Sequence, residues 1–129
     1  MAMKLKERFL MSDKTTTIEE LKKIAETFIE ERDWKQYHSP KNLSMNLSIE
    51  ASELMEKFLW LTTQESMLEI DKNKQEISDE LADVLWSVLC FSNATGIDLS
   101  QALKEKIAQT ALKYPIDKSK GKREKHTKL

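Results

Sequence analysis

Glycine and proline, the residues that most often mark turns, each occur only twice in this chain of 129 residues. Leucine, lysine, glutamate and alanine, which are good helix formers, are abundant instead. No stretch shows the sustained alternation of apolar and polar residues that is typical of a strand. The sequence therefore predicts an all-α fold with long helices and few connections.

Capping signals and prolines divide the chain into four predicted helices. Thr17 and Glu20 form a capping box, and Pro40 interrupts the helix that they begin. Gly96 is placed to end the third helix in the left-handed conformation, and Asp98 is placed to cap the fourth. The helices are expected at about residues 18–34, 41–61, 74–94 and 99–113, with one short helical turn near residues 65–70. This pattern predicts a four-helix bundle.

The length corresponds to one domain, and the composition predicts self-association. Because 40% of the residues are hydrophobic and 33% are charged, a single copy buries only a modest core. We therefore expect a dimer or a tetramer of identical chains. Within each copy we expect a flexible leader (residues 1–16), a helical domain (residues 17–115) and a basic tail (residues 116–129).

The expected tail carries six basic and two acidic residues, although the formal net charge of the whole chain is only −1. Such a segment can be a nucleic-acid arm, a phosphate clamp or a solvated terminus. The last interpretation is favoured, because short terminal charge runs are often disordered. We therefore expect no nucleic-acid partner.

Cysteine usage and hydropathy predict a soluble, cytoplasmic protein. The single Cys90 excludes a disulfide within the chain and fits a reducing compartment. The first ten residues have no sustained apolar run of the kind that a secretory signal needs. No segment approaches the ~20 apolar residues of a membrane span, so no membrane partner is expected.

Two acidic pairs, Glu50 with Glu53 and Glu80 with Asp83, are the candidate metal ligands in the sequence. Each pair is spaced i, i+3, which places both carboxylates on one face of a helix. Glu50 falls within an apolar stripe of the second helix, and Asp83 lies in the most apolar stretch of the third. Carboxylates on buried helix faces need a compensating cation, and oxygen ligands favour Mg²⁺ or Mn²⁺. The alternative is a solvated face, which a single pair of this kind would favour.

The order of these acids resembles the all-α nucleoside triphosphate pyrophosphohydrolases of the MazG type, and the dCTP pyrophosphatase branch in particular. The segments ERDW (31–34), YHSPKNL (37–43), GIDL (96–99) and KYP (113–115) extend the resemblance over nearly the whole chain. The resemblance implies hydrolysis of (deoxy)nucleoside triphosphates to a monophosphate and pyrophosphate, as a means of clearing unwanted nucleotides. It also implies that Glu50, Glu53, Glu80 and Asp83 bind Mg²⁺ or Mn²⁺, and that Glu53 or Glu50 acts in catalysis.

The same resemblance implies a set of substrate-binding positions. In the dCTP branch, the positions that match Trp34, His38 and Trp60 line the base pocket, and these residues are expected to cluster where the bundle opens. The remaining implied positions are Asn42, Ser87, Lys106, Thr110, Lys113 and Tyr114. Ser87 stands where the branch has a tyrosine that touches substrate, and Thr110 stands where the family usually has an asparagine. Without the family, the aromatic rings are core residues, the lysines are solvated, and Asn42 caps the second helix.

Two other classes of function compete with this interpretation. A ferritin-like di-iron bundle needs Glu-x-x-His on two helices, and neither His38 nor His126 follows such an acid, so this class is excluded. A non-catalytic dimerisation or adaptor module stays open, with surface ion pairs and a tail that binds nucleic acid.

Overall fold

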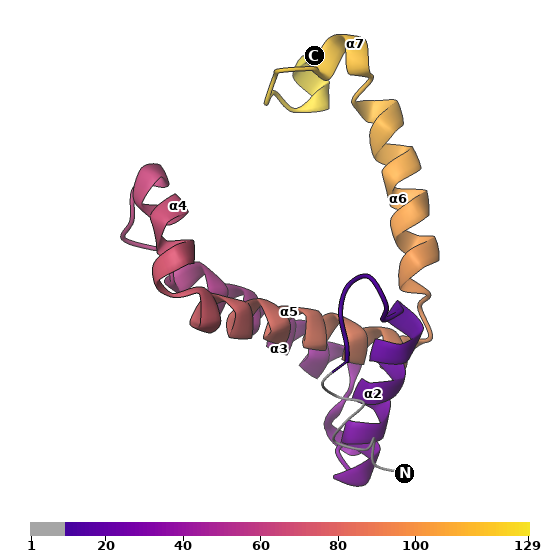
Figure 1. Cartoon of the computed structure of the whole chain (residues 1–129). Helices are drawn as coiled ribbons and strands as arrows, with labels where there is room; N and C mark the ends of the chain where they lie inside the picture. The colour runs from indigo at the N-terminus through magenta and orange to yellow at the C-terminus, as the bar shows by residue number, and fades with distance from the viewer. Residues whose placement is uncertain (1–9) are drawn as a thin grey trace. The chain divides into compact units, whose positions relative to one another are not determined.

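The computed structural model describes residues 10–129, and all regular secondary structure in that part of the chain is helical (Figure 1). The prediction of an all-α fold is therefore confirmed. The elements are α2 (Ile18–Glu31), η1 (Lys35–Tyr37), α3 (Pro40–Glu56), α4 (Thr63–Lys72), α5 (Lys74–Thr95), α6 (Leu99–Lys113), α7 (Ile116–Ser119) and η2 (His126–Lys128). Among these described helices, none is both long and apolar enough to cross a membrane.

The chain forms two compact units. The first ends at Gly96 and contains α2 to α5, and the second, Ile97–Leu129, contains α6, α7 and η2. The predicted fourth helix is α6, which belongs to the second unit, so the four-helix bundle stays a prediction. The boundary expected at residue 115 also stays a prediction. Residues 1–9 of the expected leader lie outside the described residues.

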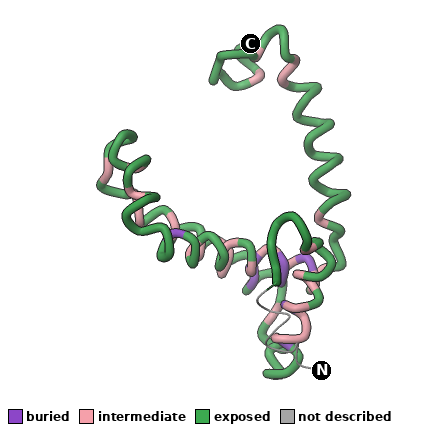
Figure 2. Tube along the Cα trace, viewed as in Figure 1, coloured by how far each residue is buried: buried purple, intermediate pink, exposed green. Residues whose placement is uncertain are grey.

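The centre of the first unit is the pair α3 and α5, which lie side by side (Figure 1). Asn46 contacts Ser87, and Lys57 contacts Glu76, so the two helices run antiparallel. Both α2 and α4 pack against α5. The buried residues gather mainly where α2 meets this pair (Figure 2), and they include Ala25, Ile29, Leu43, Leu89 and Cys90.

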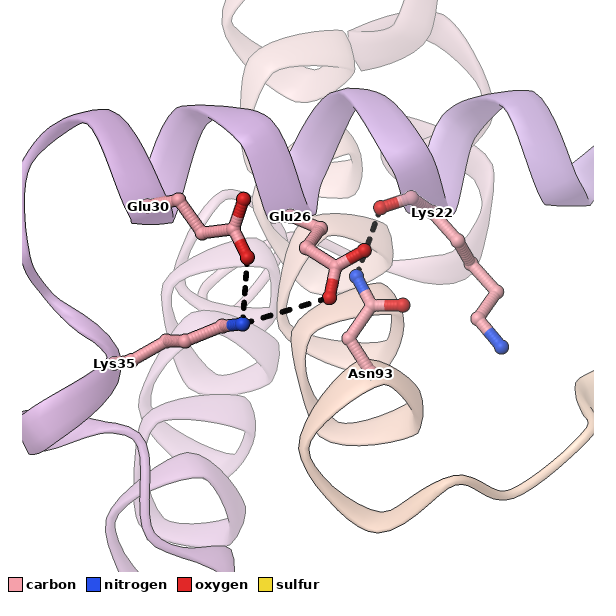
Figure 3. A network of polar contacts seen from close by, with 5 residues as sticks. All are labelled: Lys22, Glu26, Glu30, Lys35 and Asn93. Carbon is pink, nitrogen blue, oxygen red and sulfur yellow. Dashed lines mark hydrogen bonds and ion pairs between the residues drawn. The ribbon is translucent and has the colours of Figure 1, made fainter.

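Polar contacts fix α2 against α5 at this junction (Figure 3). The Asn93 side-chain amide of α5 donates a 2.8 Å hydrogen bond to the Lys22 carbonyl oxygen of α2. Beside it, the Lys35 ammonium bridges Glu30 at 2.6 Å and Glu26 at 3.6 Å. These bonds hold the connection that leads from α2 into α3.

The capping signals are confirmed. Thr17 accepts a hydrogen bond from the backbone N–H of Glu20, and the Glu20 side chain accepts one from the backbone of Thr17. Gly96 ends α5 with φ at 71°, a left-handed conformation that favours glycine. Asp98 caps α6 by accepting a 2.8 Å hydrogen bond from the backbone N–H of Gln101.

Two of the predicted helix ends are wrong. The first helix ends at Glu31 instead of about Trp34, because Asp33 adopts a left-handed conformation with φ at 52°. The second ends at Glu56 instead of Leu61, and residues 57–60 form turns. The expected single helical turn near residues 65–70 is the ten-residue helix α4, which begins with a capping box at Thr62.

Candidate functional site

Three carboxylates from α3 and α5 converge at one point and form the acid cluster, which we define as Glu50, Glu80 and Asp83. One carboxylate oxygen of each lies within 4.8 Å of those of the other two. Glu50 and Glu80 are half-buried, and Asp83 is exposed. The structure thus brings together three of the four predicted metal ligands, at the edge of the helix pair instead of on a fully buried face.

Glu53, the fourth predicted ligand, lies at the rim of the cluster. Its side chain is exposed and lies close enough to Glu50 to raise the pKa of that carboxyl. The pKa of Glu50 is raised first by partial burial, then by the neighbouring Glu53 carboxylate, and then by the charges of Asp83 and Glu80. The four carboxylates therefore crowd negative charge into one place, which a cation would relieve.

Lys57 is a site residue that the sequence reasoning missed. Its ammonium lies 3.3 Å from Glu80 and 3.3 Å from Glu76, and these two carboxylates raise the pKa of Lys57. Lys57 follows Glu53 by four residues, so it extends the same helix face as the acids. That spacing was the signal in the sequence that could have revealed it.

The donor set of the acid cluster fits a divalent cation. Carboxylate oxygens are the ligands that hard cations prefer in proteins. Lys57 forms an ion pair with Glu80 at 3.3 Å, and in the described part of the chain no ion pair joins a cation to Glu50 or Asp83. Glu50, Glu80 and Asp83 can hold such a cation, with Glu53 beside them.

Beside the acid cluster lies a cavity of about 270 Å³, which we call the His38 cavity. It is lined by Tyr37, His38, Asn42, Leu43, Asn46, Trp86, Ser87 and Cys90. Three predicted substrate-binding residues, His38, Asn42 and Ser87, therefore share one cavity. Burial lowers the pKa of His38 below 6.5, which favours the neutral imidazole near pH 7.

The expectation that Asn42 caps α3 is wrong. Ser39 is the capping residue, and its hydroxyl accepts a 3.1 Å hydrogen bond from the backbone N–H of Asn42. The Asn42 side-chain amide instead donates a 3.0 Å hydrogen bond to the Tyr37 carbonyl oxygen. Asn42 thus fixes the residues before α3 that form one wall of the His38 cavity.

The predicted clustering of Trp34, His38 and Trp60 is wrong within one chain. His38 precedes α3 and Trp60 follows it, so the length of this 17-residue helix, about 25 Å, separates them. Trp60 is 89% exposed. Trp34 is partly exposed and packs edge-on against Phe28, with ring centroids 6.0 Å apart. Of these three residues, only His38 lines the cavity.

The remaining predicted substrate contacts belong to the second unit. Lys106, Thr110 and Lys113 are exposed and follow one another at helical spacing, so they share one side of α6. Tyr114 is half-buried, and its ring meets that of His126 edge-on at 5.5 Å. Contact of these four residues with a substrate stays a prediction.

Residues 45–129 match the model of the MazG-like family, and this range contains all four predicted metal ligands. The chain belongs to the MazG-like family. It is 33% identical to dCTP pyrophosphatase 1 of Mus musculus over 115 residues, which are 88% of this chain and 68% of that protein. It is 31% identical to dCTP pyrophosphatase 1 of Homo sapiens over the same shares of both chains.

A solved structure supports the same assignment. A pyrophosphatase from Archaeoglobus fulgidus DSM 4304 superimposes on this MazG-like chain with a TM-score of 0.75 and 35% sequence identity. The match covers 81% of this chain and 98% of the archaeal one. The predicted family is confirmed, and so is the predicted enzyme class, a nucleoside triphosphate pyrophosphohydrolase. The competing adaptor interpretation is set aside.

Proposed function

We propose that this MazG-like chain hydrolyses (deoxy)nucleoside triphosphates of the dCTP type to a nucleoside monophosphate and pyrophosphate, with Mg²⁺ or Mn²⁺ as cofactor. The observation that carries the proposal is the convergence of Glu50, Glu80 and Asp83 from two antiparallel helices. Such a reaction removes unwanted nucleotides from the cytoplasmic pool, which is the role that we assign to the protein.

The acid cluster and Glu53 would hold the cation, because a triphosphate is itself an anion and four carboxylates would repel it. When bound, a divalent cation offsets charge on the phosphate oxygens and favours loss of a proton from the attacking water. Lys57 neutralises part of the cluster from its other side. Lys106 and Lys113 of α6 are proposed to bind the outer phosphates, whose negative charge they match.

The chain supplies a general base for the attacking water. Glu53 is exposed and lies beside Glu50, so we propose that it accepts the proton of the attacking water next to the cluster. The water oxygen forms a bond to the α-phosphorus, and the bond from the α-phosphorus to the oxygen bridging the α- and β-phosphates breaks. Pyrophosphate departs with that oxygen. The proton passes to Glu53, or to Glu50 beside it, and then to solvent.

A homo-oligomer, dimer or tetramer, is part of the proposal. Met45 and Ile49 on α3, together with Leu81 and Leu85 on α5, are large apolar side chains that are between 43% and 57% exposed. Each pair is spaced by one helical turn, so each forms an apolar strip that a second copy would cover. Trp34 and Trp60 are proposed to contact the base, with Trp60 donated by the second copy. Sedimentation of a compact monomer would contradict this part.

A panel of nucleoside triphosphates with pyrophosphate detection tests the proposed function. The purified protein with Mg²⁺ is expected to release pyrophosphate from at least dCTP, and excess chelator is expected to abolish the release. The proposal fails if none of the common ribo- or deoxyribonucleoside triphosphates yields pyrophosphate with either Mg²⁺ or Mn²⁺.

A further inference from the structure

A neutral hydrogen bond joins α3 to α5 one helical turn away from the acid cluster. The Asn46 side-chain amide donates to the Ser87 hydroxyl oxygen at 2.9 Å, and we call these two residues the amide–serine pair. Asn46 precedes Glu50 by four residues, and Ser87 follows Asp83 by four. Because the helices are antiparallel, both residues lie on the same side of the acids, about 6 Å away along the helix axes.

The two sides of the acid cluster differ in charge. On one side lies Lys57, which contacts Glu76 and Glu80. On the other side lie the amide–serine pair and the His38 cavity, whose lining in the described structure contains no acidic, lysine or arginine side chain. The uncharged nucleoside of a triphosphate held at the acids would therefore fit the cavity better than the side occupied by the charged groups of Lys57, Glu76 and Glu80.

The amide–serine pair leaves the Asn46 carbonyl oxygen available as a hydrogen-bond acceptor. Ser87 is 1% exposed, and the amino end of the Asn46 amide faces its hydroxyl. In the described part of the chain, no donor pairs with the Asn46 carbonyl oxygen, and Asn46 lines the cavity. A carbonyl oxygen accepts from an amino group and is repelled by a second carbonyl oxygen.

We infer that Asn46 reads the base of the substrate, and that Ser87 positions the Asn46 amide so that a 4-amino pyrimidine is preferred over a 4-oxo pyrimidine. The inference rests on the proposed function. The cavity of about 270 Å³ is large enough for the ring of a base. Asn46 is then a specificity residue, and Ser87 is a positioning residue that acts through it.

The test compares kcat/KM for dCTP and dUTP, whose bases differ at the group that Asn46 would read. The wild type is expected to prefer dCTP. Asn46→Leu removes the acceptor and is expected to lower the dCTP/dUTP ratio by about 10-fold. Ser87→Ala removes the partner of the Asn46 amide, which can then rotate, and is expected to lower the ratio by about 3-fold.

Three further variants separate base reading from a structural effect. Asn46→Asp keeps the size and the acceptor, so it is expected to retain the preference for dCTP even if overall activity falls. Asn93→Ala removes a comparable bond between helices outside the His38 cavity, and Ser92→Ala removes a serine that is equally buried on α5. Both controls are expected to leave the ratio unchanged.

The inference is overturned if the wild type does not prefer dCTP over dUTP, or if Asn46→Leu and Ser87→Ala lower both activities equally. Failure of the proposed function is distinct, because the wild type would then hydrolyse neither dCTP nor dUTP.

If the wild type hydrolyses neither triphosphate, calorimetric titration with dCMP and dUMP decides the inference. Tighter binding of dCMP that is lost in Asn46→Leu supports it, and equal or absent binding overturns it.

Discussion

Two successive turns of the α3–α5 pair differ in charge and in burial. In one turn, Glu50 and Asp83 converge with a third acid, at a place that stays partly open to solvent. In the next turn, Asn46 and Ser87 meet in a neutral hydrogen bond, and Ser87 is almost fully buried.

This difference follows from the cost of burial. A neutral polar group can be buried once it is hydrogen-bonded, whereas carboxylates need solvent or a cation. The charged turn is therefore suited to phosphate chemistry, and the neutral turn is suited to contact with a base. Four residues along each helix separate the charged turn from the neutral turn.

Removing one acid from the charged turn is expected to have the largest effect. Glu80→Gln removes the negative charge of a proposed cation ligand, so kcat/KM should fall by at least about 100-fold. Mg²⁺ is expected to raise the melting temperature of the wild type by binding to the folded state, and this rise should disappear in the variant. Differential scanning fluorimetry with and without Mg²⁺ measures it.

Glu76→Gln is the matched control. Glu76 also contacts Lys57 at 3.3 Å, but it is not part of the acid cluster. This variant should keep both the activity and the Mg²⁺ response. If Glu76→Gln and Glu80→Gln behave alike, the cation binds elsewhere and the distinction between the two turns fails.

Lys57→Met is expected to have an intermediate effect that depends on the metal. Lys57 supplies positive charge to Glu80, so its loss leaves the acids to repel one another. In chelator the melting temperature should fall by a few degrees, and saturating Mg²⁺ should recover most of that loss. An equal fall in melting temperature with and without Mg²⁺ would mean that Lys57 stabilises the protein by packing alone.

His38, which lines the cavity next to the neutral turn, predicts a smaller effect, which depends on pH. Burial lowers the pKa of His38 below its ordinary 6.5, so the folded protein binds this proton less readily than the unfolded chain does. Stability from this source is full above about pH 6.5 and is lost as the pH falls through the lowered pKa. His38→Asn should therefore reduce the fall in melting temperature between pH 7.5 and pH 5.5 by on the order of a degree. His126→Asn is the control, and identical pH profiles for all three proteins would contradict the prediction.

The sequence predicted the features that depend on neighbouring residues. The capping box of Thr17 and Glu20, the glycine at the end of α5 and the i, i+3 acids are all local patterns, and the structure contains each of them. The end of α3 was missed because residues 57–61 contain neither glycine nor proline, and the competing start signal at Thr62 lies beyond them.

What the sequence could not predict depends on the register between helices. Asn46 and Ser87 are 41 residues apart, and only the packing of α3 against α5 brings them together. Trp60 shows the opposite error. It was grouped with His38 because both flank the same helix, although the length predicted for that helix already separates its two ends.

Hydrolysis in ¹⁸O-labelled water tests the central claim most directly, because it identifies the phosphorus that the acids expose to attack. The account predicts that with dCTP and Mg²⁺ the label appears in the monophosphate, and that the pyrophosphate carries none. Mass spectrometry of the two products distinguishes the positions. Label in pyrophosphate, or release of orthophosphate and a diphosphate, would contradict attack at the α-phosphorus.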